Sequence, residues 1–87
     1  MITSAAVKIL DIIKDEEKII PCHRHCDVFY ILYLFNMKKD IDYKVIEEGF
    51  LDENDNFYSR LKAKEHAIKC NQIINTEYNE LYSEDLW

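Results

Sequence analysis

Glycine and proline are nearly absent from this sequence: its 87 residues include one of each, Gly49 and Pro21. Such a composition argues against low-complexity disorder, and it excludes a glycine-rich phosphate loop of the Walker or Rossmann kind. A long apolar run is also missing. The longest, Val28 to Phe35, has eight residues, whereas a membrane-spanning helix needs about 20. The sequence therefore predicts a folded protein with no membrane partner.

Basic residues are outnumbered by acidic ones, 11 to 17, so the formal net charge is −6. The imbalance is concentrated in residues 70–87, which contain no base and four acids, Glu77, Glu80, Glu84 and Asp85. Because nucleic acids are bound through Lys and Arg, we expect no direct nucleic-acid partner. An acidic surface does favour solubility and docking onto a basic protein.

Cysteine occurs in an odd number, as Cys22, Cys26 and Cys70, and no secretory signal is visible. This usage is typical of reduced thiols rather than of a disulfide framework. We therefore expect a cytoplasmic protein.

Two β-hairpins are predicted from the β-branched residues and the turn formers. Residues 2–13 and 18–22 form strands around a polar turn at 14–17, and Pro21 marks the edge or the end of the second strand. Residues 43–51 and 56–58 form the second pair around the Asp-rich turn 52–55. Gly49 in the longer strand indicates a bulge or a close backbone approach.

Two helices are predicted, one after each hairpin. Residues 25–36 are apolar nearly all round, which predicts the central core helix; a strand is the alternative for this aromatic run. Ser59 is a good N-cap for a helix from Arg60 to about Asn71. The fold class is therefore α+β, with two hairpins forming one antiparallel sheet packed against two helices (ββαββα). We expect one domain over 1–76 and an acidic aromatic tail, 77–87, docked on it as a strap or short helix.

The densest group of reactive side chains is Cys22-His23-Arg24-His25-Cys26, where the second strand leads into the first helix. Its Cys and His residues are zinc-ligand types, but zinc sites usually draw two pairs of ligands from separate parts of a chain, and only His66 and Cys70 lie elsewhere. A nucleophilic cysteine is a second interpretation, since a helix N-terminus with a nearby Arg lowers a thiol pKa. No oxyanion motif or third partner accompanies it. We assign no metal ligand, no catalytic residue and no cofactor.

Anion binding is a third interpretation of the same cluster. The N–H groups at a helix start, with Arg24 and His25 beside them, suit a phosphate or a carboxylate. Arg60 occupies the equivalent place at the other helix start. If both hairpins join one sheet, the two helix starts converge and two guanidinium groups share a pocket. The alternative is a purely structural role, with both Arg on a solvated edge, His25 capping the helix and the cysteines buried.

The predicted ligand-binding residues extend this pair of Arg side chains. Acidic residues would orient the guanidinium groups or bind ribose hydroxyls, and aromatic residues of the tail, Tyr78 among them, would stack on a base. The full set of predicted ligand-binding residues is Arg24, His25, Asp27, Glu48, Arg60, Tyr82, Asp85 and Trp87.

Several short motifs together resemble a family of small, mostly uncharacterised proteins of bacteriophages and prophage-bearing bacteria. They are Arg24-His25-x-Asp27, Glu48-Gly49-Phe50-Leu51, Asn56-Phe57-x-x-Arg60-x-x-Ala63, Asn71-Gln72-Ile73 and Ser83-Glu84-Asp85-Leu86-Trp87. The resemblance covers most of the chain. The sequence departs from the family pattern at Glu48, where Gln is common, and at His23, where Gly is common.

The resemblance implies a setting, the bacterial host cell, more than a chemistry. Accessory phage proteins often counter host defences, either by holding a nucleotide signal or by occupying a host effector. The cluster of Arg24, His25 and Arg60 favours a non-catalytic protein that sequesters a phosphate-containing, nucleotide-like ligand, with a homo-oligomer completing the pocket walls. The acidic surface favours the alternative, an inhibitor of a nucleic-acid-binding or CRISPR-type host effector. An enzyme is the third hypothesis.

Overall fold

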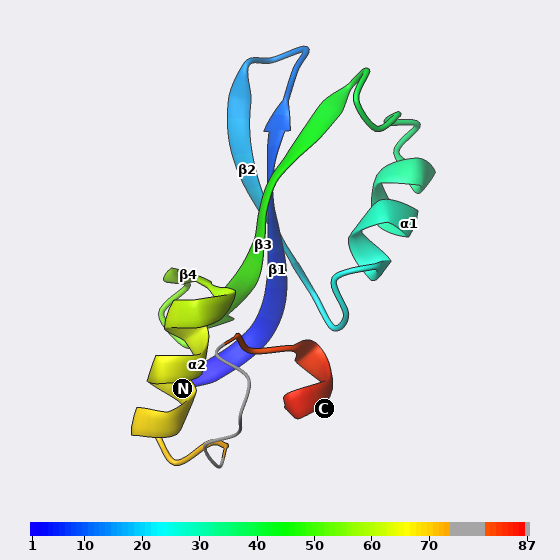
Figure 1. The fold of residues 1–87 in the computed structure, drawn as a ribbon. Coiled ribbons are helices and arrows are strands. Elements are labelled where there is room, and N and C mark those ends of the chain that lie inside the picture. The colour runs from blue at the N-terminus through cyan, green and yellow to red at the C-terminus, as the bar shows by residue number, and fades with distance from the viewer. Residues whose placement is uncertain (74–79, 87) are drawn as a thin grey trace.

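The computed structural model describes residues 1–73 and 80–86, and their elements follow the predicted order (Figure 1). The bounds are β1 Ile2–Asp11, β2 Glu16–Cys22, α1 Asp27–Leu34, β3 Tyr43–Asp52, β4 Phe57–Ser59, α2 Arg60–Lys69 and the 3-10 helix η1 Ser83–Asp85. The strands form one antiparallel sheet in the order β2-β1-β3-β4. The predicted α+β fold is confirmed, with a short helix near the C-terminus.

Asp and Asn close the turns between these elements. Five of them have positive φ, a backbone region that their short polar side chains tolerate; they are Asp15, Asn36, Asp40, Asp55 and Asn71. Asp15 lies in the β1–β2 turn, Asn36 just beyond α1, and Asp55 in the β3–β4 turn. Local sequence therefore determines where most elements end.

The central strand, β1, pairs with β2 on one side and with β3 on the other. The β1–β3 register shifts at two places, between Ile2 and Ser4 of β1 and between the pairs Lys8–Glu47 and Ile9–Val45. Ile46 is the extra residue at the second shift, and Gly49 lies at neither. Gly49 instead marks a close approach. A β-carbon there would lie 2.6 Å from Cζ of Phe57 and would collide with the backbone carbonyl oxygen of Tyr58.

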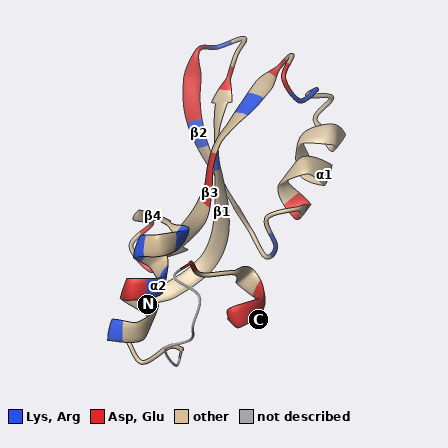
Figure 2. Ribbon diagram, in the orientation of Figure 1, with Lys and Arg blue, Asp and Glu red and all other residues tan. Residues whose placement is uncertain are grey.

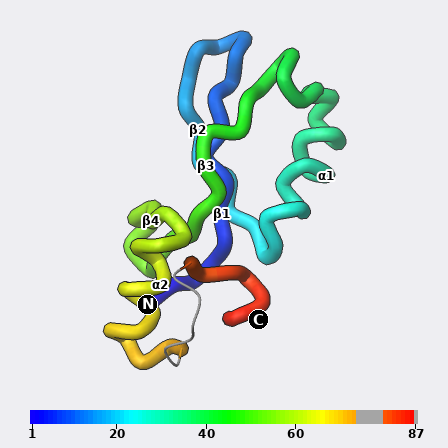
Figure 3. Tube along the Cα trace, viewed as in Figure 1, coloured from blue at the N-terminus to red at the C-terminus, as the bar shows by residue number. Residues whose placement is uncertain are grey.

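Both helices cover the same face of the sheet. Ala5 of β1 packs in the cluster beneath α2, whereas Val7 and Ile9 pack in the cluster beneath α1. Alternate residues of a strand share a face, so α2 and α1 lie over successive parts of one surface. The molecule is correspondingly elongated, 40 × 21 × 20 Å, with the β1–β2 turn toward one end and α2 toward the other (Figure 3).

The expectation that the first helix lies at the centre of the core is wrong. α1 is shorter than predicted, and its buried residues are Val28 and Leu32. Its other large apolar side chains face outward, among them Tyr33 and Phe35, each 72% exposed. The sheet covers only the side of α1 that carries Val28 and Leu32, so a helix that is apolar nearly all round buries only that side.

The C-terminal segment packs onto the body of the protein. Leu81 is fully buried in the cluster beneath α2, and its backbone N–H donates to the carbonyl of Arg60 at 3.0 Å. The predicted boundary between residues 76 and 77 lies outside the described residues, as do Glu77, Tyr78 and Trp87. Within the described part of the chain, no helix has the length and apolar character needed to cross a bilayer.

Candidate functional site

One pocket gathers most of the residues predicted to bind a ligand. Its volume is about 490 Å³, and it is lined by Arg24, His25, Cys26, Glu48, Arg60, Tyr82, Ser83 and Glu84. These residues come from the loop between β2 and α1, from β3, from the first residue of α2, and from the segment around η1. Arg24 and Arg60, which come from the starts of the two helical segments, thus line the same pocket.

Arg60 is held from three sides. Its Nη1 donates to the carbonyl of Leu81 at 3.0 Å, and its Nη2 lies 3.3 Å from Nδ1 of His25 and 3.5 Å from Oε2 of Glu48. The Tyr82 ring lies against the same guanidinium, 5.0 Å from ring centroid to Cζ. Arg60 therefore links α2, the C-terminal segment, the loop before α1 and β3.

His25 is buried beneath Arg60, and its hydrogen bonds define its tautomer. Nε2 lies 2.7 Å from the carbonyl oxygen of Gly49, and a carbonyl only accepts, so Nε2 carries the proton. Nδ1 is then the acceptor for Arg60. Burial lowers the pKa of His25, and the Arg60 charge lowers it further against the opposing effect of the Gly49 bond. His25 is thus a neutral positioning residue, not a cation or a helix cap.

Gly49 positions the carbonyl oxygen that accepts the hydrogen bond from Nε2 of His25. The ring of Phe57 and the backbone of Tyr58 occupy the space of a β-carbon at Gly49, which brings β4 close to β3. The same residue presents its carbonyl to His25 on the pocket side. The glycine that the sequence singled out for a close approach therefore also supports the site.

Arg24 is held much more loosely than Arg60. Its Nη1 is buried and has no hydrogen-bond partner in the described part of the chain. It pairs with Glu84, whose Oε1 lies 4.0 Å from Nη1 and whose side chain is 72% exposed. An exposed pair at that distance contributes little to stability. Arg24 thus presents an unsatisfied donor in the wall of the pocket, and buried donors are normally satisfied.

Several of the helix-start N–H groups, which the sequence offered as anion ligands, already have acceptors. At α1, the backbone N–H of Asp27 donates to Arg24 O, that of Val28 to His25 O, and that of Arg24 to the Asp27 carboxylate. At α2, the Ser59 hydroxyl accepts from the N–H of Lys62, which confirms the predicted N-cap. Any anion in the pocket would therefore be bound by guanidinium groups.

The predicted residues divide into three groups. Five line the pocket: Arg24, His25, Glu48, Arg60 and Tyr82. Two do not: the Asp27 carboxylate is bonded to the backbone of Arg24, and that of Asp85 accepts from the N–H of Tyr82 at 3.0 Å. Trp87 lies outside the described residues. Sequence reasoning missed Cys26, Ser83 and Glu84 as lining residues, although Glu84 stands in the quoted C-terminal motif.

The cluster from Cys22 to Cys26 differs in geometry and in burial from the interpretations offered above. Among residues 1–73 and 80–86, no group of three or more Cys, His, Asp or Glu side chains is arranged to hold a metal ion. Burial raises the pKa of the Cys22 thiol to about 11, the opposite of what a nucleophilic cysteine requires. Cys26 is exposed, contrary to the structural alternative that buried it.

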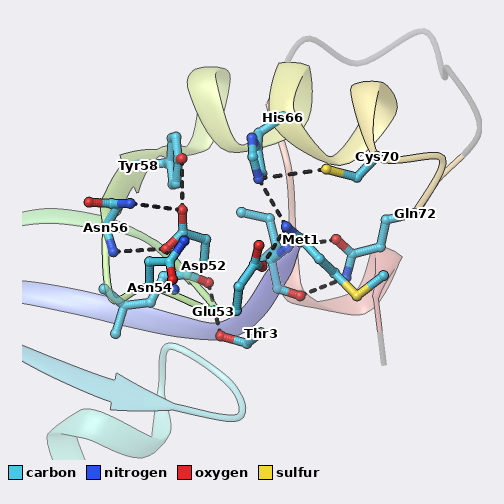
Figure 4. A network of polar contacts seen from close by, with 12 residues as sticks. Met1, Thr3, Asp52, Glu53, Asn54, Asn56, Tyr58, His66, Cys70 and Gln72 are labelled. Atoms are coloured by element: carbon cyan, nitrogen blue, oxygen red, sulfur yellow. Dashed lines mark hydrogen bonds and ion pairs between the residues drawn. The ribbon is translucent and has the colours of Figure 1, made fainter.

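A second polar network closes the β3–β4 turn (Figure 4). The buried Asp52 carboxylate accepts from the backbone N–H groups of Asn54 and Asn56, the Asn56 side chain and the Tyr58 hydroxyl, at 2.9 to 3.1 Å. Burial acts to raise the pKa of Asp52, but these hydrogen bonds outweigh it and hold that pKa well below its usual range. His66 is half-buried and stacks on Tyr58 at 4.9 Å between centroids. Because these groups satisfy one another, the network is structural.

Comparison with known proteins places the chain among phage proteins. A family model described as Phage T4 y16D protein matches residues 1–87. No curated protein and no solved structure matches the chain. The match agrees with the resemblance to small phage proteins, while the individual motifs quoted for it stay a prediction.

Proposed function

We propose that this chain, which belongs to the phage T4 y16D family, binds a small phosphate-containing, nucleotide-like ligand between Arg24 and Arg60. The observation that carries the proposal is the buried Nη1 of Arg24, which has no hydrogen-bond partner within residues 1–73 and 80–86; Arg24 itself lines a pocket of about 490 Å³. A buried donor without an acceptor costs roughly 1–3 kcal/mol, and more when it is charged. An anionic oxygen seated there would remove that cost.

The charges of the pocket allow an anion to enter. Glu48 already contacts Arg60, so its negative charge is compensated. Glu84 faces Arg24 across 4.0 Å and is largely in solvent, so a ligand phosphate displaces it at little cost. His25 is neutral and contributes no charge of its own. Arg24 is then the cation available to bind a ligand anion, and Arg60, already held by hydrogen bonds, lies beside it.

The size and the aromatic wall favour a nucleotide over a bare phosphate. Small-molecule sites commonly have volumes of roughly 300–1,000 Å³, and this pocket lies within that range. The Tyr82 ring forms part of the wall beside Arg60, and a base gains about 1–3 kcal/mol by stacking on such a ring. We assign Tyr82 to the base and Arg24 to the phosphate.

The hydrogen bonds of His25 favour ligand binding over catalysis. A general base needs a free ring nitrogen within reach of the substrate proton, and both nitrogens of His25 are engaged. In an infected cell, a protein that holds a nucleotide without consuming it would deplete a host signal. Counter-defence by sequestration is therefore the role we propose.

The test is a calorimetric titration of the full chain with inorganic phosphate, pyrophosphate, and linear and cyclic nucleotides. Arg24→Gln is the informative variant, because the buried Nη1 of its guanidinium has no hydrogen-bond partner among the described residues. Loss of one charge-assisted hydrogen bond weakens binding by about 10- to 150-fold. Lys62→Gln, an exposed cation on α2, is the matched control and leaves binding unchanged. Absence of binding to every member, or equal binding by Arg24→Gln, would overturn the proposal.

An acidic inhibitor is the second candidate, and the charge of the C-terminal segment favours it. Glu80, Glu84 and Asp85 are all exposed, and Figure 2 shows acidic residues gathered on η1. Docking through them onto a basic host effector predicts an affinity that falls steeply with salt. Pull-down from host lysate with the wild type and with Glu80→Gln/Glu84→Gln tests this; equal recovery of the same protein by both would contradict it.

A further inference from the structure

We propose that a recess between the β1–β2 hairpin and the C-terminal end of α1 binds a free aliphatic monocarboxylate, whose chain lies inside and whose carboxylate lies at Lys14. This hairpin pocket has a volume of about 420 Å³. It shares no lining residue with the pocket of Arg24 and Arg60, so the inference does not depend on nucleotide binding.

The hairpin pocket exists because the hairpin extends farther than the helix that covers it. α1 ends at Leu34, whereas β1 continues past Ile9, which packs in the cluster beneath α1, to Asp11 and the turn. The β1–β2 turn and this end of α1 lie toward the same end of the molecule (Figure 1). After the helix, the backbone N–H of Met37 donates to the carbonyl of Leu32 at 3.0 Å. The segment that follows α1 is thereby held as a wall of the recess.

Apolar side chains form most of the hairpin pocket. Its buried part includes Ile9 and Leu32, whereas Ile13 and Phe35 are 75% and 72% exposed at its rim. Large apolar side chains left exposed around a recess are typical of a binding site, and the volume lies within the usual range for small molecules. The many polar groups of a nucleotide would find few hydrogen-bond partners in such a lining, which is costly. The body of the ligand is therefore a hydrocarbon chain.

The charged residues of the lining indicate an anionic head group. Asp11 is buried, and its carboxylate accepts from Nζ of Lys18 and from the backbone N–H of Lys14, both at 3.1 Å. The Lys14 side chain is exposed, and none of the ion pairs within residues 1–73 and 80–86 involves it. Asp42, which follows α1, does not line the recess, and its carboxylate accepts from the backbone N–H of Lys38. One ammonium group at the rim is thus available to a carboxylate.

Calorimetric titration of the full chain with hexanoate, octanoate and decanoate, each below its micelle concentration, tests the hydrocarbon part. Burial of two further methylenes is expected to raise the affinity by about five- to fifteenfold at each step. Octylammonium carries the same chain as octanoate with the opposite charge. The net charge of the protein, −6, by itself favours the ammonium ligand. Tighter binding of octanoate is therefore expected only if the local charge at Lys14 decides.

Two variants of exposed residues test the position of the ligand. Lys14→Gln is expected to weaken octanoate binding by about two- to fivefold, and Lys62→Gln, an exposed cation of α2, is its matched control. Ile13→Asn removes an apolar side chain from the rim and is expected to weaken binding by about three- to tenfold. Its control is Ile19→Asn, at an exposed isoleucine that pairs with Lys8 on the other face of the sheet from Ile9.

Thermal melting by circular dichroism checks that every variant is folded. The inference is overturned if decanoate does not bind, if octylammonium binds as tightly as octanoate, or if either Lys14→Gln or Ile13→Asn binds octanoate like the wild type. Loss of octanoate binding in Arg24→Gln would also overturn it, because the ligand would then lie in the other pocket. Failure of decanoate alone, with nucleotide binding retained, leaves the proposed function standing. Weaker binding in both hairpin variants, with unchanged binding in their two controls, supports the assignment.

Discussion

Replacing Gly49 by alanine tests whether the close approach of β4 to β3 supports both the sheet and the site. Strand propensity alone favours this change, because alanine in the middle of a strand is more stable than glycine by roughly 0.5–1 kcal/mol. The structure requires the opposite sign. A β-carbon at this position collides with the carbonyl oxygen of Tyr58 and lies 2.6 Å from Cζ of Phe57.

The size of the effect depends on which of the two neighbours yields. The Phe57 ring rotates at modest cost, but the Tyr58 carbonyl belongs to the backbone of β4, which pairs with β3 through only three residues. Overpacking in a tight site costs about 1–3 kcal/mol. We expect Gly49→Ala to lower the free energy of unfolding by about 2 kcal/mol.

Urea denaturation followed by circular dichroism measures that loss. Combining Gly49→Ala with Phe57→Ala separates the two contacts, since the ring is removed and the backbone collision remains. Gly49→Ala should therefore cost less stability in the Phe57→Ala background than in the wild type, but some of the cost should remain. A Gly49→Ala protein as stable as the wild type would refute the reasoning, because propensity would then outweigh the collision.

Arg60→Lys is expected to lower the free energy of unfolding by about 1–3 kcal/mol, since an ammonium group cannot replace three hydrogen bonds made in different directions; an unchanged urea midpoint would contradict this. The lowered pKa of folded His25 means that the unfolded chain binds its proton more readily, so stability declines as pH falls below about 6.5; denaturation of wild type and His25→Gln across pH 5 to 8 should show less of this decline in the variant. The contribution of Asp52, whose pKa is lowered, is present above about pH 4 and fades as pH falls toward the folded value. Asp52→Asn should therefore be less stable than wild type at pH 7, with the gap narrowing at pH 3. Glu84→Gln removes the carboxylate that competes for Arg24, so phosphate or nucleotide affinity should rise by up to about fivefold in calorimetry; a fall would show that Glu84 binds the ligand itself.

Much of the fold could be predicted because its signals are local. Ser59 accepts from an N–H three residues away, and the Asp and Asn residues of the turns adopt positive φ within their own segments. Interactions of this kind depend only on a few consecutive residues. Strand pairing within each hairpin follows for the same reason, since a short turn brings neighbouring strands together.

The role of α1 could not be predicted in the same way. Its apolar composition predicts burial on all sides, yet burial requires partners, and the sheet covers only the side of Val28 and Leu32. The register shift at Ile46 could not be predicted either, because it depends on the pairing of β1 with β3, two strands that are separated in the sequence by β2 and α1.

The sequence by itself determined the elements, their turns, and the presence of two arginines at equivalent places before two helices. Only the tertiary structure decided what those arginines do. His25 and Arg60 are 35 residues apart, and the strand order that places β3 beside β1 brings them into contact. That contact engages Arg60 and neutral His25 and leaves Arg24 with the unsatisfied donor. Hydrogen-bond satisfaction is a property of groups meeting in space, so it follows from the packing of distant segments and not from their local order.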